Sequence, residues 1–562
     1  MSEQSFSLGI DFGSNSVRAL FIDAGTGEEF GVGVVEYSAG DKGVLSDSAN
    51  PHVARQRPSD YLSSMEKAVA LAMDDARSQK GFDSGKVVGI GVDTTGSTPI
   101  PVDASNRPLE HSPEFKDNLD ALAWMWKDHS GMEEAEKITA AARETRPAYL
   151  AKCGGTYSSE WFFSKIWHCL NASPEVFDAA ASWVEFADFI PAVLAGVDDP
   201  KSIKRSVCAA GHKAMFSSDW GGLPDEEFLA SLDPRLPRCL DGLYDTACAA
   251  DEVAGRLCPE WASKFGLPSN VPVAVGAFDA HMGAVGAGVG PGRLVKIIGT
   301  STCDLMVAPN SMDLPDIPGV CGVVDGSVLP GYYGIEAGQS AVGDIFNWFV
   351  AKVCKGGGAE FAELTAEAEK LSPGESGLVA LDWNNGNRTV LVDPKLTGLI
   401  MGLTLHTSRA EIFRALIEAT AFGARKIIDR LEEFGVRVED VVNCGGIAEK
   451  NTMLMDIYAS VLNRPMRISA SSQTCALGAA MFGAVVGGAH ADIESAQKRI
   501  CAFKERIHRP DPSAVALYDE LYGVYSELHD GFGVGKEPSD CSGAMKKLLS
   551  ISSEARLAKA DA

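Results

Sequence analysis

The sequence is short of basic residues. It has 50 Lys and Arg against 76 Asp and Glu, which gives a formal net charge of −26 at pH 7. A surface that acidic repels the phosphates of nucleic acids and the head groups of anionic lipids. We therefore expect neither nucleic acid nor a membrane surface among the partners of this chain.

Long apolar runs and paired cysteines are also missing. The longest run of small apolar residues, 476–489, is shorter than the roughly 20 residues that cross a bilayer. The first residues show no basic stretch followed by an apolar one, so we expect no secretory signal and no membrane segment. The 13 cysteines include no CxxC pair, and an odd number cannot all pair within one chain. This number and spacing of cysteines fit best with reduced thiols in the cytoplasm.

Two common nucleotide-binding motifs are absent as well. The chain contains no GxxxxGKS or GxxxxGKT, and no GxGxxG between a clear strand and a helix. Neither a P-loop nor a standard dinucleotide site is supported, so a nucleotide would need a cradle of another kind.

The chain does have enough apolar residues for a large core. Its 562 residues, 45% of them hydrophobic, predict two or three domains. Continuous apolar runs at 87–92 and 271–276 are typical of strands covered on both faces in α/β proteins. The glycine-dense stretch 283–293 is the predicted domain junction. We expect an N-terminal domain over 1–290, a C-terminal domain over 291–510, and a helical segment with a weakly packed tail over 511–562.

A long helix is predicted in the second half of the chain. Ser408 and Glu411 have the spacing of a capping box, and apolar residues then recur with helical period as far as Gly435. A buried strand ending in glycines follows at 441–446, and another helix from about Asn451.

Two segments share the pattern of strand, small polar turn and strand. Residues 6–10 and 16–22 flank the first turn, and 294–298 and 303–308 flank the second. Small residues let backbone N–H groups approach an anion, and such turns bind phosphate oxygens. Taken alone, the first segment is better interpreted as an ordinary surface hairpin. The pair suggests a duplicated clamp for the phosphates of a nucleotide, and Asp11 in the first could hold Mg²⁺.

Asp279 follows a buried strand, where open α/β sheets place their ligands. A carboxylate there could accept the proton of an attacking hydroxyl in phosphoryl transfer. A helix N-cap is an equally good interpretation of this residue taken alone.

Several other polar groups stand in apolar or glycine-rich surroundings. Lys213, Glu336 and the loop 94–97 could bind sugar hydroxyls, although a surface lysine and a helix-start carboxylate are the simpler interpretations. His212 and His281 have no third metal ligand at a recognisable spacing, which favours structural roles.

Aromatic residues gather in two places. Trp161, Phe162, Ile166 and Trp167 lie at helical spacing and predict a core face. Trp126 stands beside charged residues, an arrangement that suits the mixed faces of a sugar but also packing between domains.

These segments together resemble the FGGY carbohydrate kinases, and among them the ribulokinases. The resemblance runs from about Leu8 to about Gly488. The order of the matching segments along the chain, together with the TTGST and WKDH segments, is more specific than any single motif. The matching segments are DFGSNSVRAL (11–20), GIGVDTTGSTPIPVD (89–103), WMWKDH (124–129), EWFFSKIWH (160–168), CAAGHKAM (208–215), GAFDAHMGAVGAG (276–288), GTSTCD (299–304), GIEAGQSAVGD (334–344), ALDWNNGNRT (380–389) and GGIAEKN (445–451).

The resemblance implies an α/β protein with a two-lobed, duplicated, actin-like (ribonuclease H-like) ATPase fold and a central cleft. It implies ATP and Mg²⁺, with Asp11 at the metal and Asp279 as the catalytic base. The residues implied at the nucleotide are Gly13, Ser14, Ser16, Arg18, Gly299, Thr300, Gly445 and Gly446. Those implied at the ketopentose are Gly96, Ser97, Trp126, Lys213, Asp279 and Glu336.

The activity implied is ATP-dependent phosphorylation of L-ribulose, or of another 2-ketopentose, at the 5-hydroxyl in L-arabinose breakdown. Three alternatives stay open: an FGGY kinase for another sugar or polyol, an actin-like ATPase that needs no sugar, and a silent sugar-responsive regulator. No DNA-binding helix-turn-helix is apparent, and the negative charge also argues against the regulator. The oligomeric state is open, a homodimer included.

Overall fold

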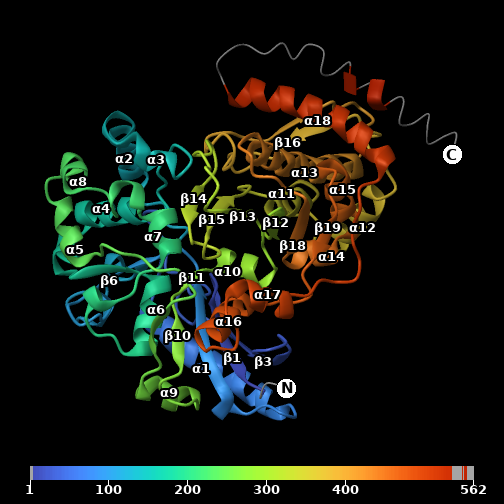
Figure 1. Cartoon of the computed structure of the whole chain (residues 1–562). Coiled ribbons are helices and arrows are strands. Elements are labelled where there is room, and N and C mark those ends of the chain that lie inside the picture. The colour runs from blue at the N-terminus through green and yellow to red at the C-terminus, as the bar shows by residue number, and fades with distance from the viewer. Residues whose placement is uncertain (1–3, 535–546, 549, 553–562) are drawn as a thin grey trace.

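The computed structural model describes residues 4–534, 547, 548 and 550–552. Two mixed β-sheets form its framework, and helices cover them (Figure 1). Within these residues, no helix combines the length and apolar character needed to cross a membrane. Most of the predicted tail after residue 534 lies outside the described residues.

The first sheet comes from the N-terminal half of the chain. Its strands run in the order β3-β2-β1-β5-β10-β9, and β11 also pairs with β5. The β1–β2 hairpin is antiparallel, whereas β5 runs parallel to β1. The strands are β1 (Phe6–Phe12), β2 (Ser16–Asp23), β3 (Glu29–Glu36), β5 (Val87–Thr94), β9 (Val253–Arg256), β10 (Pro272–Ala274) and β11 (Ala277–Phe278).

The second sheet repeats this pairing pattern with later strands. Its order is β14-β15-β13-β12-β18-β19, with β12 and β13 antiparallel and β18 parallel to β12. Both predicted hairpins are therefore confirmed, each beside a parallel strand, and so is the duplication. The strands are β12 (Arg293–Ile298), β13 (Thr302–Pro309), β14 (Gly322–Asp325), β15 (Tyr332–Ala337), β18 (Asp440–Cys444) and β19 (Met466–Ile468).

Helices and three small sheets complete the framework. The helices before β12 are α1 (Pro58–Ser78), α2 (Met132–Thr145), α3 (Pro147–Ala151), α4 (Phe162–Ala172), α5 (Pro174–Ala179), α6 (Phe186–Ala195), α7 (Val207–Lys213), α8 (Glu226–Leu232), α9 (Pro259–Phe265) and α10 (Asp279–Gly286). Those after it are α11 (Gly343–Trp348), α12 (Gly358–Ala368), α13 (Arg409–Glu433), α14 (Gly446–Lys450), α15 (Thr452–Leu462), α16 (Thr474–Val486), α17 (Ile493–Ile500) and α18 (Pro512–Gly533). The small sheets pair β4 (Arg55–Gln56) with β7 (Ala123–Trp124), β6 (Pro99–Val102) with β8 (Ser182–Glu185), and β16 (Val379–Leu381) with β17 (Leu399–Met401).

The two halves meet through helices α10 and α16. Figure 1 shows both helices between the sheets, and α16 packs on β1 and β5 although it follows the second sheet in the sequence. Gly9 permits this contact, because a Cβ there would lie 1.9 Å from the Ala476 carbonyl oxygen. A late segment of the chain thus closes one face of the first sheet.

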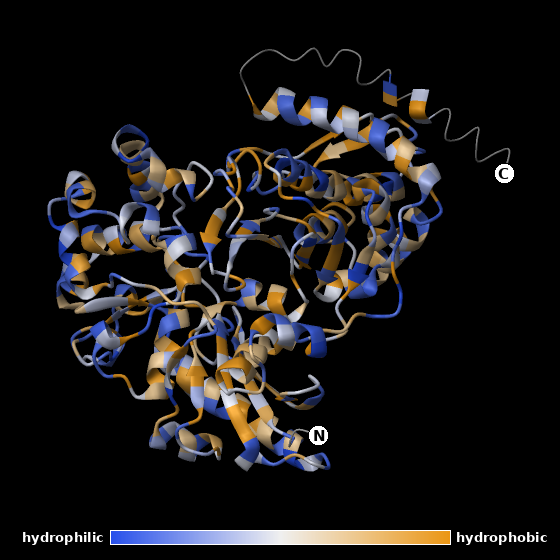
Figure 2. Ribbon diagram, viewed as in Figure 1, coloured by the Kyte–Doolittle hydropathy of each residue, from blue (hydrophilic) through white to orange (hydrophobic). Residues whose placement is uncertain are grey.

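Hydrophobic periodicity explains the main elements. The β1 strand is buried throughout, and the sheet strands are largely apolar whereas outer helices such as α18 also carry hydrophilic residues (Figure 2). The predicted helix near 408–435 is α13, and Ser408 and Glu411 form the expected capping box. The first aromatic cluster is core as predicted, since Trp161, Phe162 and Trp167 are at most 7% exposed.

Candidate active site

Three carboxylates meet where strands of the first sheet end. Asp11 in β1 lies opposite Asp93 in β5, and Asp93 lies opposite Ala277 in β11, two residues before Asp279. The carboxyl ends of parallel strands share one edge of a sheet, where α/β proteins bind ligands. The structure therefore brings together two predicted residues, Asp11 and Asp279, with one that sequence reasoning missed, Asp93.

Asp93 is the least satisfied of the three. It is fully buried, and as an ionised carboxylate it receives no hydrogen bond on either oxygen from the described residues. Burial raises its pKa well above the ordinary value, and the charges of Asp11 and Asp279, with a side-chain hydrogen bond to Asp11, raise it further. The missed signal was the expected strand 87–92, which is followed directly by an aspartate just as 6–10 is followed by Asp11.

Asp279 has the electrostatic setting of a base. Burial raises its pKa to about 7, and the neighbouring charge of Asp11 adds to the effect. The residue begins α10 and accepts the Ala280 N–H at 2.7 Å, so it does not cap the helix from outside. A carboxyl group with a pKa near neutrality can take up and release a proton during turnover.

The first turn lies beside this carboxylate group. Arg18 Nη1 is 3.0 Å from Asp11 Oδ2, and the Gly13 N–H donates to the Ser16 carbonyl at 3.0 Å. Trp126 Nε1 donates to Ser14 Oγ at 2.9 Å. The structure thus places Trp126, expected at the sugar, against a residue expected at the phosphates.

The second turn is held against the segment that follows β15. Gly299 and Thr300 are exposed, and their carbonyl oxygens accept the N–H groups of Gly343 and Val342 at 3.1 and 2.8 Å. The Gly299 N–H donates to the Ser301 carbonyl at 2.9 Å, so the turn is also held from within, and the exposed side of Thr300 is the part that faces outward.

The glycine pair after β18 lies next to this turn. Gly445 has a φ of 101°, and a Cβ on it would lie 2.4 Å from the Ile298 carbonyl oxygen. Gly446 begins α14 with open space around its missing Cβ. This is an open backbone surface of the kind expected beside an adenine ring.

A second charged cluster surrounds Glu336. Lys213 Nζ is 3.1 Å from each of its oxygens, and Arg388 Nη2 is 2.8 Å from Oε1. Burial alone would raise the pKa of Glu336, but the positive charges of Lys213 and its neighbours hold it well below the usual range. Lys213 and Glu336 come together as predicted, and Arg388 is a partner that no local pattern indicated.

Two histidines also face Glu336. His212 Nδ1 and His281 Nε2 lie 3.6 and 3.8 Å from Glu336 Oε2, so Glu336 is the third potential metal ligand that the sequence spacing did not reveal. Burial lowers the pKa of His281 to about 4, so its imidazole is neutral at physiological pH. Because Lys213 and Arg388 already neutralise Glu336, this trio is a poor site for a divalent cation.

The loop after β5 supports Asp279 from the side. A Cβ on Gly96 would lie 1.7 Å from Phe278 Cε1, so the loop packs directly on the residue before Asp279. The Ser97 hydroxyl donates to Glu185, and Lys165 Nζ donates to the Ser97 carbonyl at 2.8 Å. The hydroxyl of Ser97 is therefore already engaged within the protein.

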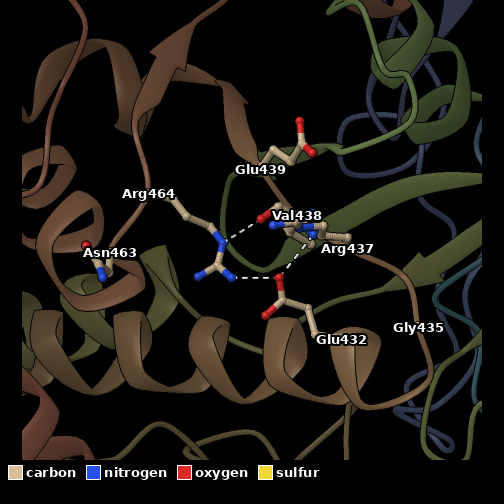
Figure 3. Close-up of a pocket in the computed structure, with 7 residues that line it drawn as sticks. All are labelled: Glu432, Gly435, Arg437, Val438, Glu439, Asn463 and Arg464. Carbon is tan, nitrogen blue, oxygen red and sulfur yellow. Dashed lines mark hydrogen bonds and ion pairs between the residues drawn. The ribbon is translucent and has the colours of Figure 1, made fainter.

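A separate pocket opens at the other end of the second sheet (Figure 3). Its volume is about 730 Å³, and it lies before the start of β18, whereas Gly445 follows the end of that strand. Arg464 is paired there with Glu432 at 2.7 Å and with the Val438 carbonyl at 2.7 Å. The pocket is distinct from the predicted site. It is lined by Glu432, Gly435, Arg437, Val438, Glu439, Asn463 and Arg464.

Comparison with protein families accounts for nearly the whole framework. The N-terminal domain of the FGGY family of carbohydrate kinases matches residues 6–286, and the C-terminal domain of that family matches residues 294–486. The chain belongs to the FGGY family of carbohydrate kinases. It is a carbohydrate kinase, as its sequence motifs predicted.

Individual relatives agree with this assignment. The chain is 42% identical over 548 residues to a ribulokinase of Vibrio parahaemolyticus, covering 94% of this chain and 96% of the relative. It is 40% identical over 565 residues to a ribulokinase of Shouchella clausii, covering 97% and 98%.

Solved structures share the fold at lower identity. A xylulose kinase from Rhodospirillum rubrum superposes with a TM-score of 0.75 at 22% identity, covering 93% of this chain and 98% of that one. A Plasmodium falciparum glycerol kinase with ADP gives 0.75 at 15% identity, with the same coverage. The predicted two-lobed α/β fold is confirmed.

Proposed function

We propose that this kinase transfers the terminal phosphoryl group of ATP to the 5-hydroxyl of L-ribulose, with other 2-ketopentoses as secondary substrates. The observation that carries the proposal is the identity of about 40% to ribulokinases over nearly the full length of both chains. In an organism that uses L-arabinose, this activity would belong to the breakdown of that sugar.

Asp279 is the residue to which we assign the proton transfer. As the sugar oxygen forms its bond to the γ-phosphorus, the bond from phosphorus to the β–γ bridging oxygen breaks and ADP leaves. The hydroxyl proton passes to the Asp279 carboxylate, whose pKa of about 7 suits both uptake and later release to water. Phosphoryl transfer has a loose transition state, so positioning contributes more than covalent help.

The two turns are assigned to the phosphates. Gly13 and Ser14 in the first and Gly299 and Thr300 in the second have the small side chains that let backbone groups approach an anion. Ser16 and Arg18 would complete the part of the phosphate site that the first turn forms. Gly445 and Gly446 would lie against the adenosine, where a side chain on the first of them would collide with Ile298.

A magnesium ion fits the carboxylate end of this site. Asp93 has two buried oxygens without a hydrogen-bond partner, Asp11 lies opposite it, and hard cations prefer such oxygen ligands. We propose Asp11 and Asp93 as the residues that would hold Mg²⁺, which when bound would neutralise negative charge on the phosphates.

The sugar is assigned to the space beside Asp279. Lys213 and Glu336 supply a donor and an acceptor 3.1 Å apart. The charge of Glu336 also helps to raise the pKa of Asp279, so the two groups are near each other. Gly96, Ser97 and Trp126 would line the approach. This assignment explains why an ion pair is buried here, since sugar hydroxyls can bond to both of its members.

A panel of sugars tests the proposal. ADP release would be followed with L-ribulose, D-ribulose, L-xylulose, D-xylulose, glycerol and no sugar. We expect the highest kcat/KM for L-ribulose and negligible release without sugar. Saturation with glycerol alone would point to a polyol kinase, and equal ADP release without sugar would point to an actin-like ATPase.

A further inference from the structure

A line of buried hydrogen bonds begins in α18, at the outer face of the second sheet's half of the molecule (Figure 1). The Tyr525 hydroxyl donates to Asp382 Oδ1 at 2.8 Å, and Gln339 Nε2 donates to Asp382 Oδ2 at 2.7 Å. All three residues are at most 5% exposed. One carboxylate thus joins the C-terminal helix to the segment after β15.

Gln339 links these hydrogen bonds to the second turn. Its N–H donates to Thr302 Oγ1 at 3.0 Å, and its carbonyl oxygen accepts the Thr302 N–H at 3.0 Å. Its side-chain Oε1 accepts from Lys296 Nζ at 3.0 Å, and Lys296 is paired with Asp304 at 2.7 Å. Thr302 is the first residue of β13, directly after the turn, so Gln339 holds both strands of the hairpin.

We propose that Tyr525 is a positioning residue for the phosphates of ATP, which acts through Asp382 and Gln339 on the turn 299–301. The inference rests on the proposed function, because it takes this turn to contact the nucleotide. Phosphate donors must be held to within about half an ångström of their productive positions. Gly299 and Thr300 in the turn are exposed, so their position depends on the buried groups behind them.

The orientation of Gln339 is the sensitive step. Its amide nitrogen faces Asp382 Oδ2 and the Thr420 carbonyl at 2.7 and 2.8 Å, while its amide oxygen faces Lys296. Removing the Tyr525 hydroxyl leaves one buried oxygen of Asp382 without its donor, which is costly, so the carboxylate turns toward other donors. Gln339 then loses Asp382 as a fixed partner, and its hydrogen bonds to Thr302 weaken.

The same helix offers a matched control in Tyr518. This residue is 1% exposed, and its hydroxyl donates to Glu418 Oε1 and accepts from Arg414 Nη2, each at 3.0 Å. Arg414 Nη1 in turn donates to the carbonyl oxygens of Ala368, in α12, and Leu371, after it. The two tyrosines therefore resemble each other in burial and bonding, but only Tyr525 leads to the turn.

Kinetics of Tyr525→Phe and Tyr518→Phe in the full-length chain test the proposal. Each substrate is varied at saturation of the other, and calorimetry gives the Kd of MgADP. We expect Tyr525→Phe to raise the KM for ATP and the Kd of MgADP by about 5- to 10-fold, with the KM for L-ribulose changed less than twofold. Tyr518→Phe should change none of these beyond twofold. Equal nucleotide effects of the two variants, or none for Tyr525→Phe, would overturn the proposal.

A second variant guards against a folding defect. Asp382→Asn keeps an acceptor for Tyr525 but presents an amide to the Gln339 amide, so it should weaken nucleotide binding in the same direction. Melting temperatures are recorded for every variant. If the wild type binds MgADP and phosphorylates ribulose while neither variant changes nucleotide binding, this inference alone fails. If the wild type binds no nucleotide, the proposed function fails, and this inference with it.

Discussion

The two sheets share a strand pattern, but the buried carboxylates next to their two turns are arranged in opposite ways. In the first half, the ionised Asp93 side chain receives no hydrogen bond from the described residues, and Asp279 has a pKa raised to about 7. In the second half, Asp304 is paired with Lys296, and Asp382 receives two hydrogen bonds. Perturbed groups gather at functional sites and satisfied ones at structural sites. We infer that the carboxylates beside the first turn are available for the chemistry, whereas those behind the second turn hold its backbone in place.

The largest effect should come from Asp279. Asp279→Asn keeps the shape of the side chain but removes the proton acceptor, so kcat should fall about 10²- to 10⁴-fold. Calorimetry should find nucleotide affinity within a few-fold of the wild type. Near-normal turnover in this variant would remove Asp279 from the role of base.

A buried pair in the second half should respond through stability instead. Lys296→Met leaves Asp304 buried without its cation, which should cost about 3–5 kcal/mol in urea unfolding. Lys137→Met is the control, because Lys137 is exposed and its pair with Glu133 is worth well under about 1 kcal/mol. An equal loss of unfolding free energy in both variants would show that the buried Lys296–Asp304 pair does not hold the second half in place.

Asp93 should behave in the opposite way to Lys296. Its pKa in the folded chain is raised well above the unfolded value, so the folded state loses stability as pH rises above about 4 toward that raised pKa. Asp93→Asn removes this cost. Without Mg²⁺ at pH 8, we expect the variant to melt about 2–4 °C higher than the wild type, and the gain should shrink toward pH 4. A lower melting temperature at pH 8 would show that Asp93 is satisfied after all.

The smallest predicted change is a shift in pH dependence, measured on the residual activity of a variant whose rate also falls because Asp11 is assigned to Mg²⁺. The charge of Asp11 helps to raise the pKa of Asp279, so Asp11→Asn should lower that pKa and move the acid limb of kcat/KM to lower pH by about one unit. The rate rises with pH because the base must be ionised. The profile is measured at subsaturating MgATP so that it reports the free enzyme. Asp198→Asn, at an exposed acid, should leave the limb in place; the same shift in both variants would exclude a local effect.

Local sequence patterns were sufficient to predict the hairpins, the capped helix α13 and the position of Asp279 after a buried strand. They could not predict that Arg388 joins Lys213 at Glu336, because residues so far apart meet only through the packing of the two halves. Asp93 was missed because it directly follows the expected strand 87–92, and an aspartate in that position is conspicuous only once its neighbours in the structure are known.

A crystal structure with a non-hydrolysable ATP analogue, Mg²⁺ and L-ribulose would test the central claim most directly. We expect the terminal phosphate to contact both Ser14 and Thr300, with an Asp279 oxygen within about 2.6–3.2 Å of the sugar's 5-hydroxyl. Phosphates bound by only one of the two turns, or a 5-hydroxyl placed against a different base, would contradict the account.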